Sequence, residues 1–88
     1  MKIELIGHLR SFVDKGVLEL KIEGQTSLIE VLKMLPRELR EVLLEDGKPK
    51  PGFLLLLNGS DVRSFEKSIE TLVLDEDTLT IIPIIHGG

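Results

Sequence analysis

One amphipathic helix stands between two groups of predicted strands, and it limits the ways in which this chain can fold. Ser27 lies three residues before Glu30, which is capping-box spacing, so a helix is expected to begin there. An apolar stripe at positions i, i+3, i+4 and i+7 follows, formed by Leu28, Val31, Leu32 and Leu35. Pro36 breaks this helix, and residues 36–45 are expected to form a second short one. A single main helix can cover one face of a sheet.

The segments on both sides of this helix are predicted to be strands. Before it, residues 1–7 and 17–23 alternate charged and apolar side chains, which is typical of half-buried strands. After it, residues 53–57 and 78–82 are predicted strands, and Asn58-Gly59 is a strong turn signal. Residues 48–52 are expected to form a stiff loop, and residues 62–74 are expected to form short irregular elements.

The order of these elements predicts an α+β fold in which a mixed sheet of four or five strands packs on one main helix. A right-handed crossover through the helix returns the later strands to the same sheet. This arrangement is the β-grasp, or ubiquitin-like, fold. We expect one β-grasp domain over residues 1–83 and a flexible, reactive C-terminal tail over residues 84–88.

Composition excludes several classes of function. The net charge is −4 and no basic block occurs, which disfavours direct binding of nucleic acid. The absence of cysteine excludes disulfides, cysteine metal sites and thiol nucleophiles on this chain. No apolar run approaches the ~20 residues that span a bilayer, and the alternating N-terminus does not resemble a signal peptide. A cytoplasmic location is therefore expected, with no membrane partner.

The titratable residues do not predict an enzyme. His8 and His86 are the only histidines, too few for a zinc site built from protein alone, so no metal is expected. The sequence contains no recognisable Ser/His/Asp arrangement and no phosphate-binding loop. We therefore expect a co-substrate or small subunit of an enzyme that binds no cofactor of its own.

The later strands carry more apolar side chains than one helix layer can cover. Residues 54–57 are all leucine, and Ile81 is followed by Ile82. If Leu55, Leu57 and Ile81 face the helix, the opposite face carries an apolar patch. The residues predicted for it are Ile6, Leu54, Leu56, Ile82, Ile84 and Ile85. Such a patch is typical of a partner site. Alternatively, these are ordinary hydrophobic central strands, or the second short helix covers them.

The sequence ends in Gly87-Gly88, a few residues after the last predicted strand. Two residues without side chains can thread a narrow tunnel. A carboxylate is a poor electrophile, but it becomes reactive as an acyl adenylate formed with ATP. Because the chain has no phosphate loop, ATP and Mg2+ would be used by an activating partner. Gly88 is therefore predicted to be a reactant. The alternative is that the diglycine is an arbitrary frayed end.

Several stretches of the chain match a known family. The strongest matches are residues 57–62, 74–79, 81–83 and 86–88, and Leu9-Arg10 matches a Leu-Arg pair after the first strand. On these residues the chain resembles the ubiquitin-like sulfur carriers, particularly the small subunit of molybdopterin synthase (MoaD family). The thiamine-pathway carrier (ThiS) and the ubiquitin-related modifier are relatives. The family often has aromatics at positions 6 and 81 or 82, where this chain has isoleucine, and an acidic residue where it has Ser11.

The resemblance implies a reaction and partners. An E1-like enzyme would adenylate Gly88, which would become a thiocarboxylate and donate its sulfur. In the molybdopterin synthase subfamily the sulfur goes to a molybdopterin precursor, with the tail inserted into the large synthase subunit. His86 would touch the nucleotide pocket of the partner, or is merely a tolerated tail residue. Arg10 would pair with an acidic group of the activator, or is a solvated surface residue.

Other roles stay open at this point. Members of the family feed tRNA thiolation or thiamine synthesis, and some archaeal relatives form isopeptide bonds with lysines of other proteins. The chain could thus be a modifier conjugated through Gly88. It could also be a β-grasp interaction module with an inert tail.

Overall fold

The computed structural model describes residues 1–84. Its main sheet has five strands in the order β2-β1-β9-β6-β7. These strands are β1 (Lys2–Leu5), β2 (Val17–Glu19), β6 (Phe53–Leu57), β7 (Ser60–Asp61) and β9 (Thr78–Pro83). The sheet is mixed, because β1 and β9 are parallel whereas the other pairs are antiparallel. The predicted mixed sheet of the β-grasp is therefore confirmed.

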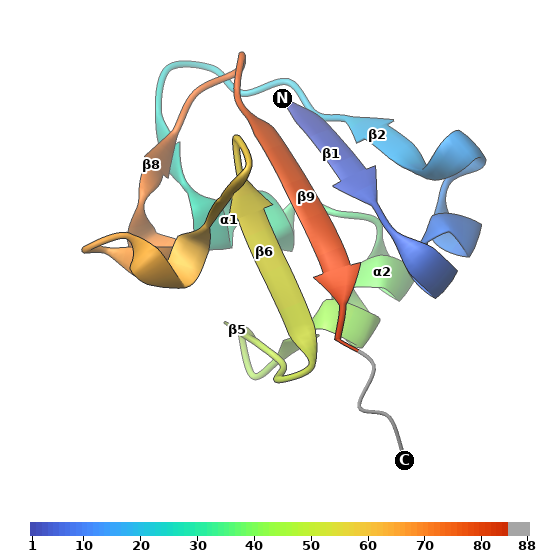
Figure 1. Ribbon diagram of the computed structural model, residues 1–88. Coiled ribbons are helices and arrows are strands. Elements are labelled where there is room, and N and C mark those ends of the chain that lie inside the picture. Colours follow the sequence, from blue (N-terminus) through green and yellow to red (C-terminus); the bar gives the residue numbers. More distant parts are fainter. Residues whose placement is uncertain (85–88) are drawn as a thin grey trace.

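The helix α1 (Leu28–Lys33) begins where the capping box predicts. Ser27 Oγ accepts a hydrogen bond from the Glu30 amide at 3.4 Å. Pro36 then starts the helix α2 (Arg37–Leu43). Both helices lie behind the sheet in Figure 1, so they cover the same face of it.

The second helix is shorter than expected, because a hairpin follows Leu43 directly. The strands β4 (Leu44–Glu45) and β5 (Lys48–Pro49) pair across Asp46-Gly47. Both turn residues have positive φ, 52° and 75°, as a tight two-residue hairpin requires. The prediction of helix to residue 45 and of a plain loop from residue 48 was therefore wrong. The Asp-Gly turn overrides the helical pattern there.

The strand predicted over residues 17–23 ends at Glu19. Beyond it, the Leu20 amide donates to the Met1 carbonyl at 2.8 Å, and the Ile22 amide donates to Asp75 Oδ1 at 2.8 Å. Ile22 is nevertheless buried, as the alternation predicts. The backbone amides after β2 thus form hydrogen bonds outside the β1–β2 ladder. Buried backbone groups in folded proteins are nearly always paired in this way.

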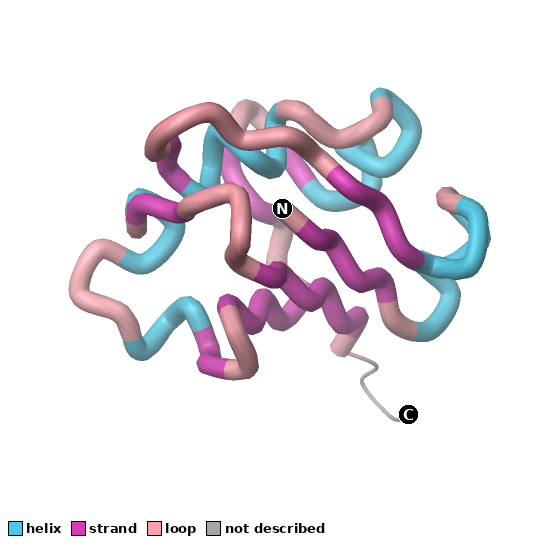
Figure 2. The backbone as a smooth tube through the Cα atoms, turned by 90° about the horizontal axis from the view of Figure 1, so that it is seen from above, coloured by secondary structure: helices cyan, strands magenta, loops and turns pink. Residues whose placement is uncertain are grey.

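Short elements complete the fold. Figure 2 shows helical turns and loops between the strands. The 3-10 helices are η1 (Gly7–Phe12), η2 (Asp14–Gly16), η3 (Val62–Ser64) and η4 (Ser68–Glu70). A separate ladder joins β3 (Thr26–Ser27), just before α1, to β8 (Leu72–Val73).

The core lies between the sheet and the two helices. The sheet contributes Ile3, Leu5, Leu57, Leu79 and Ile81, and the helices contribute Leu28, Val31, Leu32, Leu39 and Leu43, all buried. Leu35, after α1, is also buried, so the whole predicted stripe is in the core. Within residues 1–84, neither helix is long and apolar enough to cross a membrane.

Candidate functional site: the open face and the root of the tail

The face of the sheet away from the helices carries a row of apolar side chains. Leu54 pairs with Ile82 across β6 and β9, and the Ile6 amide donates to the Ile81 carbonyl at 3.1 Å. Leu5 and Ile81 point into the core, with exposed fractions of 2% and 0%. Because side chains alternate along a strand, Ile6 and Ile82 point the other way. Ile6, Ile82 and Leu54 therefore form one row on the open face.

Ile84 and Leu56 extend this row. The Ile84 amide donates to the Gly52 carbonyl at 2.7 Å, which continues the β6–β9 register, so Ile84 lies on the side of Ile82. Leu56 pairs with Thr80, one step along the strands. Ile84 and Ile6 are 40% and 41% exposed, whereas Leu56 is half-buried. We call Ile6, Leu54, Leu56, Ile82 and Ile84 the open-face patch.

The open face of the sheet is apolar at the end of β9 from which the tail leaves, and polar at the other end. There the cross-strand partners are Lys2, Glu19 and Thr78. Val17, exposed at 40%, borders the patch through its pairing with Glu4. Val17 was not among the predicted partner-binding residues, although its position in the alternation of residues 17–19 indicates the same face.

The second helix does not cover the patch. Leu39 and Leu43 of α2 are buried in the core together with Ile81, on the opposite side of the sheet. Figure 1 shows both helices behind the strands. One of the two alternatives to a partner site is thereby excluded.

Two glycines hold the root of the tail. A Cβ atom on Gly7 would lie 3.2 Å from Cγ of Pro83, and Gly7 has φ +61°. On the other side, Gly52 supplies the carbonyl that Ile84 uses. Pro83 has no N–H to donate to β1, so it stays in register only with β6. The chain therefore leaves the sheet between β1 and β6 at a defined place.

Arg10 borders the open-face patch. It lines a shallow pocket together with Ile6 and Val17. Its side chain lies across Gly16, because a Cβ atom there would be 3.0 Å from both Cγ and Nε of Arg10. Arg10 is thus an exposed residue beside Ile6 and Val17, and its predicted pairing with a partner stays a prediction.

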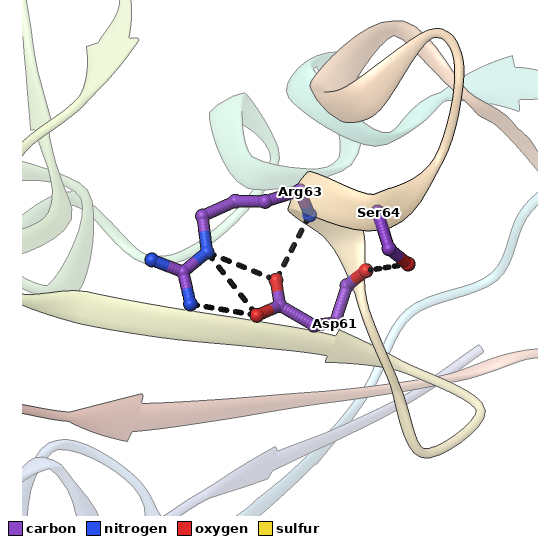
Figure 3. Close-up of polar contacts among 3 residues, drawn as sticks. All are labelled: Asp61, Arg63 and Ser64. Carbon is purple, nitrogen blue, oxygen red and sulfur yellow. Dashed lines mark hydrogen bonds and ion pairs between the residues drawn. The ribbon is translucent and has the colours of Figure 1, made fainter.

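An ordered polar cluster at the end of β7 has a structural role (Figure 3). Arg63 Nη2 lies 2.7 Å from Asp61 Oδ2, the Arg63 amide donates to Asp61 Oδ1, and Ser64 Oγ donates to the Asp61 carbonyl. The hydrogen bonds from the Arg63 side chain and amide lower the pKa of Asp61. The cluster caps η3 and fixes the turn after β7.

Ile85, His86, Gly87 and Gly88 lie outside the described residues, so the structure places neither the predicted reactant nor the tail contacts. The described part of the chain contains no group of three His, Cys, Asp or Glu side chains that could hold a metal ion.

Comparison with known proteins identifies the family. Residues 1–88 match the family described as Urm1 (ubiquitin related modifier). The chain belongs to the Urm1 family. A putative sulfur carrier protein of Archaeoglobus fulgidus is 31% identical over 83 residues, covering 91% of this chain and 93% of the relative. The ubiquitin-related modifier 1 homolog of Dictyostelium discoideum is 32% identical over 95 residues, covering 100% and 98%.

Solved structures agree with this assignment. Sulfolobus solfataricus Urm1 superposes with a TM-score of 0.73 at 30% identity, covering 96% of this chain and 100% of that one. The small archaeal modifier protein 1 of Methanosarcina acetivorans gives 0.81 at 29% identity, covering 99% and 94%. The β-grasp fold and the resemblance to ubiquitin-like sulfur carriers are thus confirmed. The Urm1-family chain is a protein of the sulfur-carrier and modifier type, not an enzyme.

Proposed function

We propose that this Urm1-family chain carries sulfur on its terminal carboxylate, with Gly88 as the reacting residue and Gly87 as its unhindered approach. The observation that supports this most directly is the position of the open-face patch, which runs to the root of the tail at Ile84. A partner that covers Ile6, Ile82 and Ile84 would lie directly beside the residue from which the tail begins. Binding and presentation of the terminus are thereby coupled.

This chain and its activating enzyme each supply part of the chemistry. A Gly88 carboxylate oxygen attacks the α-phosphate of ATP, and pyrophosphate leaves. A persulfide of the partner then attacks the acyl carbon and AMP leaves. A second thiol of the partner attacks the S–S bond of this acyl disulfide, which forms a disulfide on the partner and releases Gly88 as the thiocarboxylate. An E1-like partner uses the ATP and Mg2+, since this sequence has no phosphate loop. A cytoplasmic location fits this use of ATP.

The length of the tail sets a limit on the partner. An extended chain spans at most 3.3–3.6 Å per residue, so Gly88 reaches at most about 14 Å beyond Ile84. The reacting centre of the activating enzyme must lie within that distance of the surface that receives the patch. Ile85 and His86 would line this path, and Arg10 would fix the orientation of the docked domain.

Sulfur donation and protein modification use the same activated Gly88. If a lysine amine attacks the acyl adenylate instead of sulfur, an isopeptide bond forms and AMP leaves. Relatives of this chain named as modifiers support this second candidate. For the sulfur itself, a molybdopterin precursor held by a large synthase subunit is the destination that the sequence resemblance favours. Thiolated tRNA and thiamine synthesis are the alternatives.

The deciding experiment is the intact mass of the chain after incubation with its E1-like enzyme, ATP, Mg2+ and a sulfur donor. Replacement of one oxygen by sulfur, mapped to Gly88 and dependent on ATP, is the expected result. Products linked through lysine would favour the modifier. An unchanged mass with an enzyme proven active on another carrier would contradict both and leave an inert interaction module.

A further inference from the structure

A groove on the helix side of the molecule has no role in the proposal above. It lies between the end of α1, the helix α2 and the β4–β5 hairpin, and it has a volume of about 450 Å3. The residues that line it are Lys33, Arg37, Arg40, Glu41, Leu44 and Gly47. Three cations and one carboxylate thus line a single groove on a chain of net charge −4. Such a local reversal of charge attracts acidic partners.

Two of these cations are held only by weak local pairs. Lys33 Nζ lies 3.4 Å from a Glu30 oxygen, and Arg37 Nε lies 3.2 Å from a Glu41 oxygen. All four side chains are largely exposed, between 46% and 82%. Exposed pairs of this kind contribute little, because water screens them. An incoming carboxylate can therefore replace either partner at small cost.

Arg40 has no ion-pair partner within residues 1–84. Its Nε is buried without a hydrogen bond, although the residue as a whole is only half-buried. The two terminal nitrogens of Arg40 are not buried, and no described residue accepts a hydrogen bond from them. Arg40 therefore lines the groove with terminal nitrogens that no residue within 1–84 uses. A planar fork of this kind binds a carboxylate through two parallel hydrogen bonds.

The hairpin forms the opposite wall. Gly47 has φ +75°, and a Cβ atom there would lie 4.0 Å from Cε of Lys33, so the turn approaches the end of α1 closely. Leu44 adds a half-buried apolar surface. Glu45 and Asp46 belong to the same hairpin but do not line the groove. The groove thus offers cations around one apolar contact.

We propose that this groove binds an acidic segment of a partner protein, with a carboxylate on Arg40 and Arg37 and an apolar side chain against Leu44. The groove lies on the helix side, whereas the open-face patch lies on the other face of the sheet. Both surfaces can be occupied together. A second protein can hold the domain while its tail is inside an enzyme, and this inference does not depend on the chemistry of Gly88.

The test is an NMR titration of the 15N-labelled full chain with an end-capped peptide of four glutamates around one leucine. Amide shifts are expected to cluster in residues 33–47 and to weaken as salt is added. Arg40→Met keeps the aliphatic stem, and Arg37→Gln changes a side chain that is 82% exposed. Each variant is expected to raise the dissociation constant at least about fivefold. The matched control Lys21→Gln removes one positive charge elsewhere and should leave it unchanged.

Three results would overturn the proposal. Equal shifts with the peptide in which glutamine replaces glutamate would show that charge does not matter. Shifts centred on the open-face patch would assign the peptide to that surface. Inorganic phosphate that reproduces the same shifts with the same affinity would indicate a small-anion site rather than a peptide site. If Arg40→Met alters the fold, Arg37→Gln still decides the outcome.

Discussion

Pro83 packs against Gly7 so closely that a side chain on Gly7 would begin 3.2 Å from Cγ of Pro83. This contact joins the first residue of η1, two positions after the end of β1, to the last residue of β9. It helps to hold the end of β9 beside β1 even though Pro83 cannot donate a hydrogen bond to that strand.

Gly7→Ala is expected to destabilise the domain by more than the backbone strain alone. A residue other than glycine in the left-handed region costs about 1–2 kcal/mol. The contact with Pro83 adds to that cost and shifts the tail root. Gly24→Ala is the matched control, because Gly24 has φ +66° and nothing within 4 Å of its Cβ position. Urea denaturation gives the free energy of unfolding of both variants. Equal losses would show that the Pro83 contact does not contribute to stability.

Ile82→Lys is expected to leave the fold intact and to weaken binding to the activating enzyme. Ile82 lies half-buried on the open face, where a lysine stem can lie along the surface with its charge in water. Ile81→Lys, one residue away, should unfold the domain by placing an unpaired charge in the core, at a cost above about 4 kcal/mol. Circular dichroism and a pull-down with the enzyme distinguish the two. Unfolding by Ile82→Lys would reverse the assignment of faces.

Asp75 is expected to make stability depend on acid. The hydrogen bond from the Ile22 amide, and then the bond from the Met1 amino group at 3.0 Å, lower the pKa of Asp75. A carboxyl with a lowered pKa in the folded state stabilises the fold above its unfolded pKa of ~3.9, and this contribution is lost as pH falls through the folded pKa.

Asp75→Asn should therefore lower the melting temperature at neutral pH and flatten its fall in acid. The exposed neighbour Glu76, replaced by glutamine, is the control. Melting curves recorded from neutral pH to strong acid measure both. Parallel curves for Asp75→Asn and the unmodified chain would contradict the role of this carboxylate.

Asn58 is expected to stabilise the β6–β7 turn in two ways. Its Nδ2 donates to Asp77 Oδ1 at 3.0 Å, its Oδ1 accepts from the Thr78 amide at 2.9 Å, and its φ is 50°. Asn58→Ala loses both bonds and adds left-handed strain, about 2–3 kcal/mol together. Asn58→Gly loses the bonds without the strain and should cost less. Chemical denaturation ranks the two variants, and a glycine variant no more stable than the alanine one would refute the strain component.

Local patterns in the sequence predict the regular elements well. The capping box at Ser27 and the apolar stripe after it give α1, since both depend on residues within one or two turns of each other. Alternation predicts the two faces of the sheet, because a strand has a period of two. It therefore separates Ile82 from Ile81 without knowledge of the partners of β9.

Contacts between distant segments could not be predicted in this way. The residues around Leu20 contain no signal that β2 ends at Glu19. The strand ends there because the Ile22 amide donates to Asp75, which lies more than 50 residues away in the sequence. The β5 strand includes Pro49, a residue that indicates a loop when it is seen alone. The roles of Gly7 and Gly52 at the tail root likewise depend on Pro83 and Ile84, which lie more than 30 residues from either glycine.

The central position of β9 has a consequence for synthesis on the ribosome. The strand joins the β2–β1 hairpin to the β6–β7 hairpin. Without it, two separate strand pairs remain, and a two-stranded pair is only marginally stable by itself in water. The nascent chain therefore cannot complete its sheet until residues 78–83 have emerged. A copy cut before Thr78 is therefore expected to lose its fold together with its terminus, and not to persist as a folded domain that lacks only the tail.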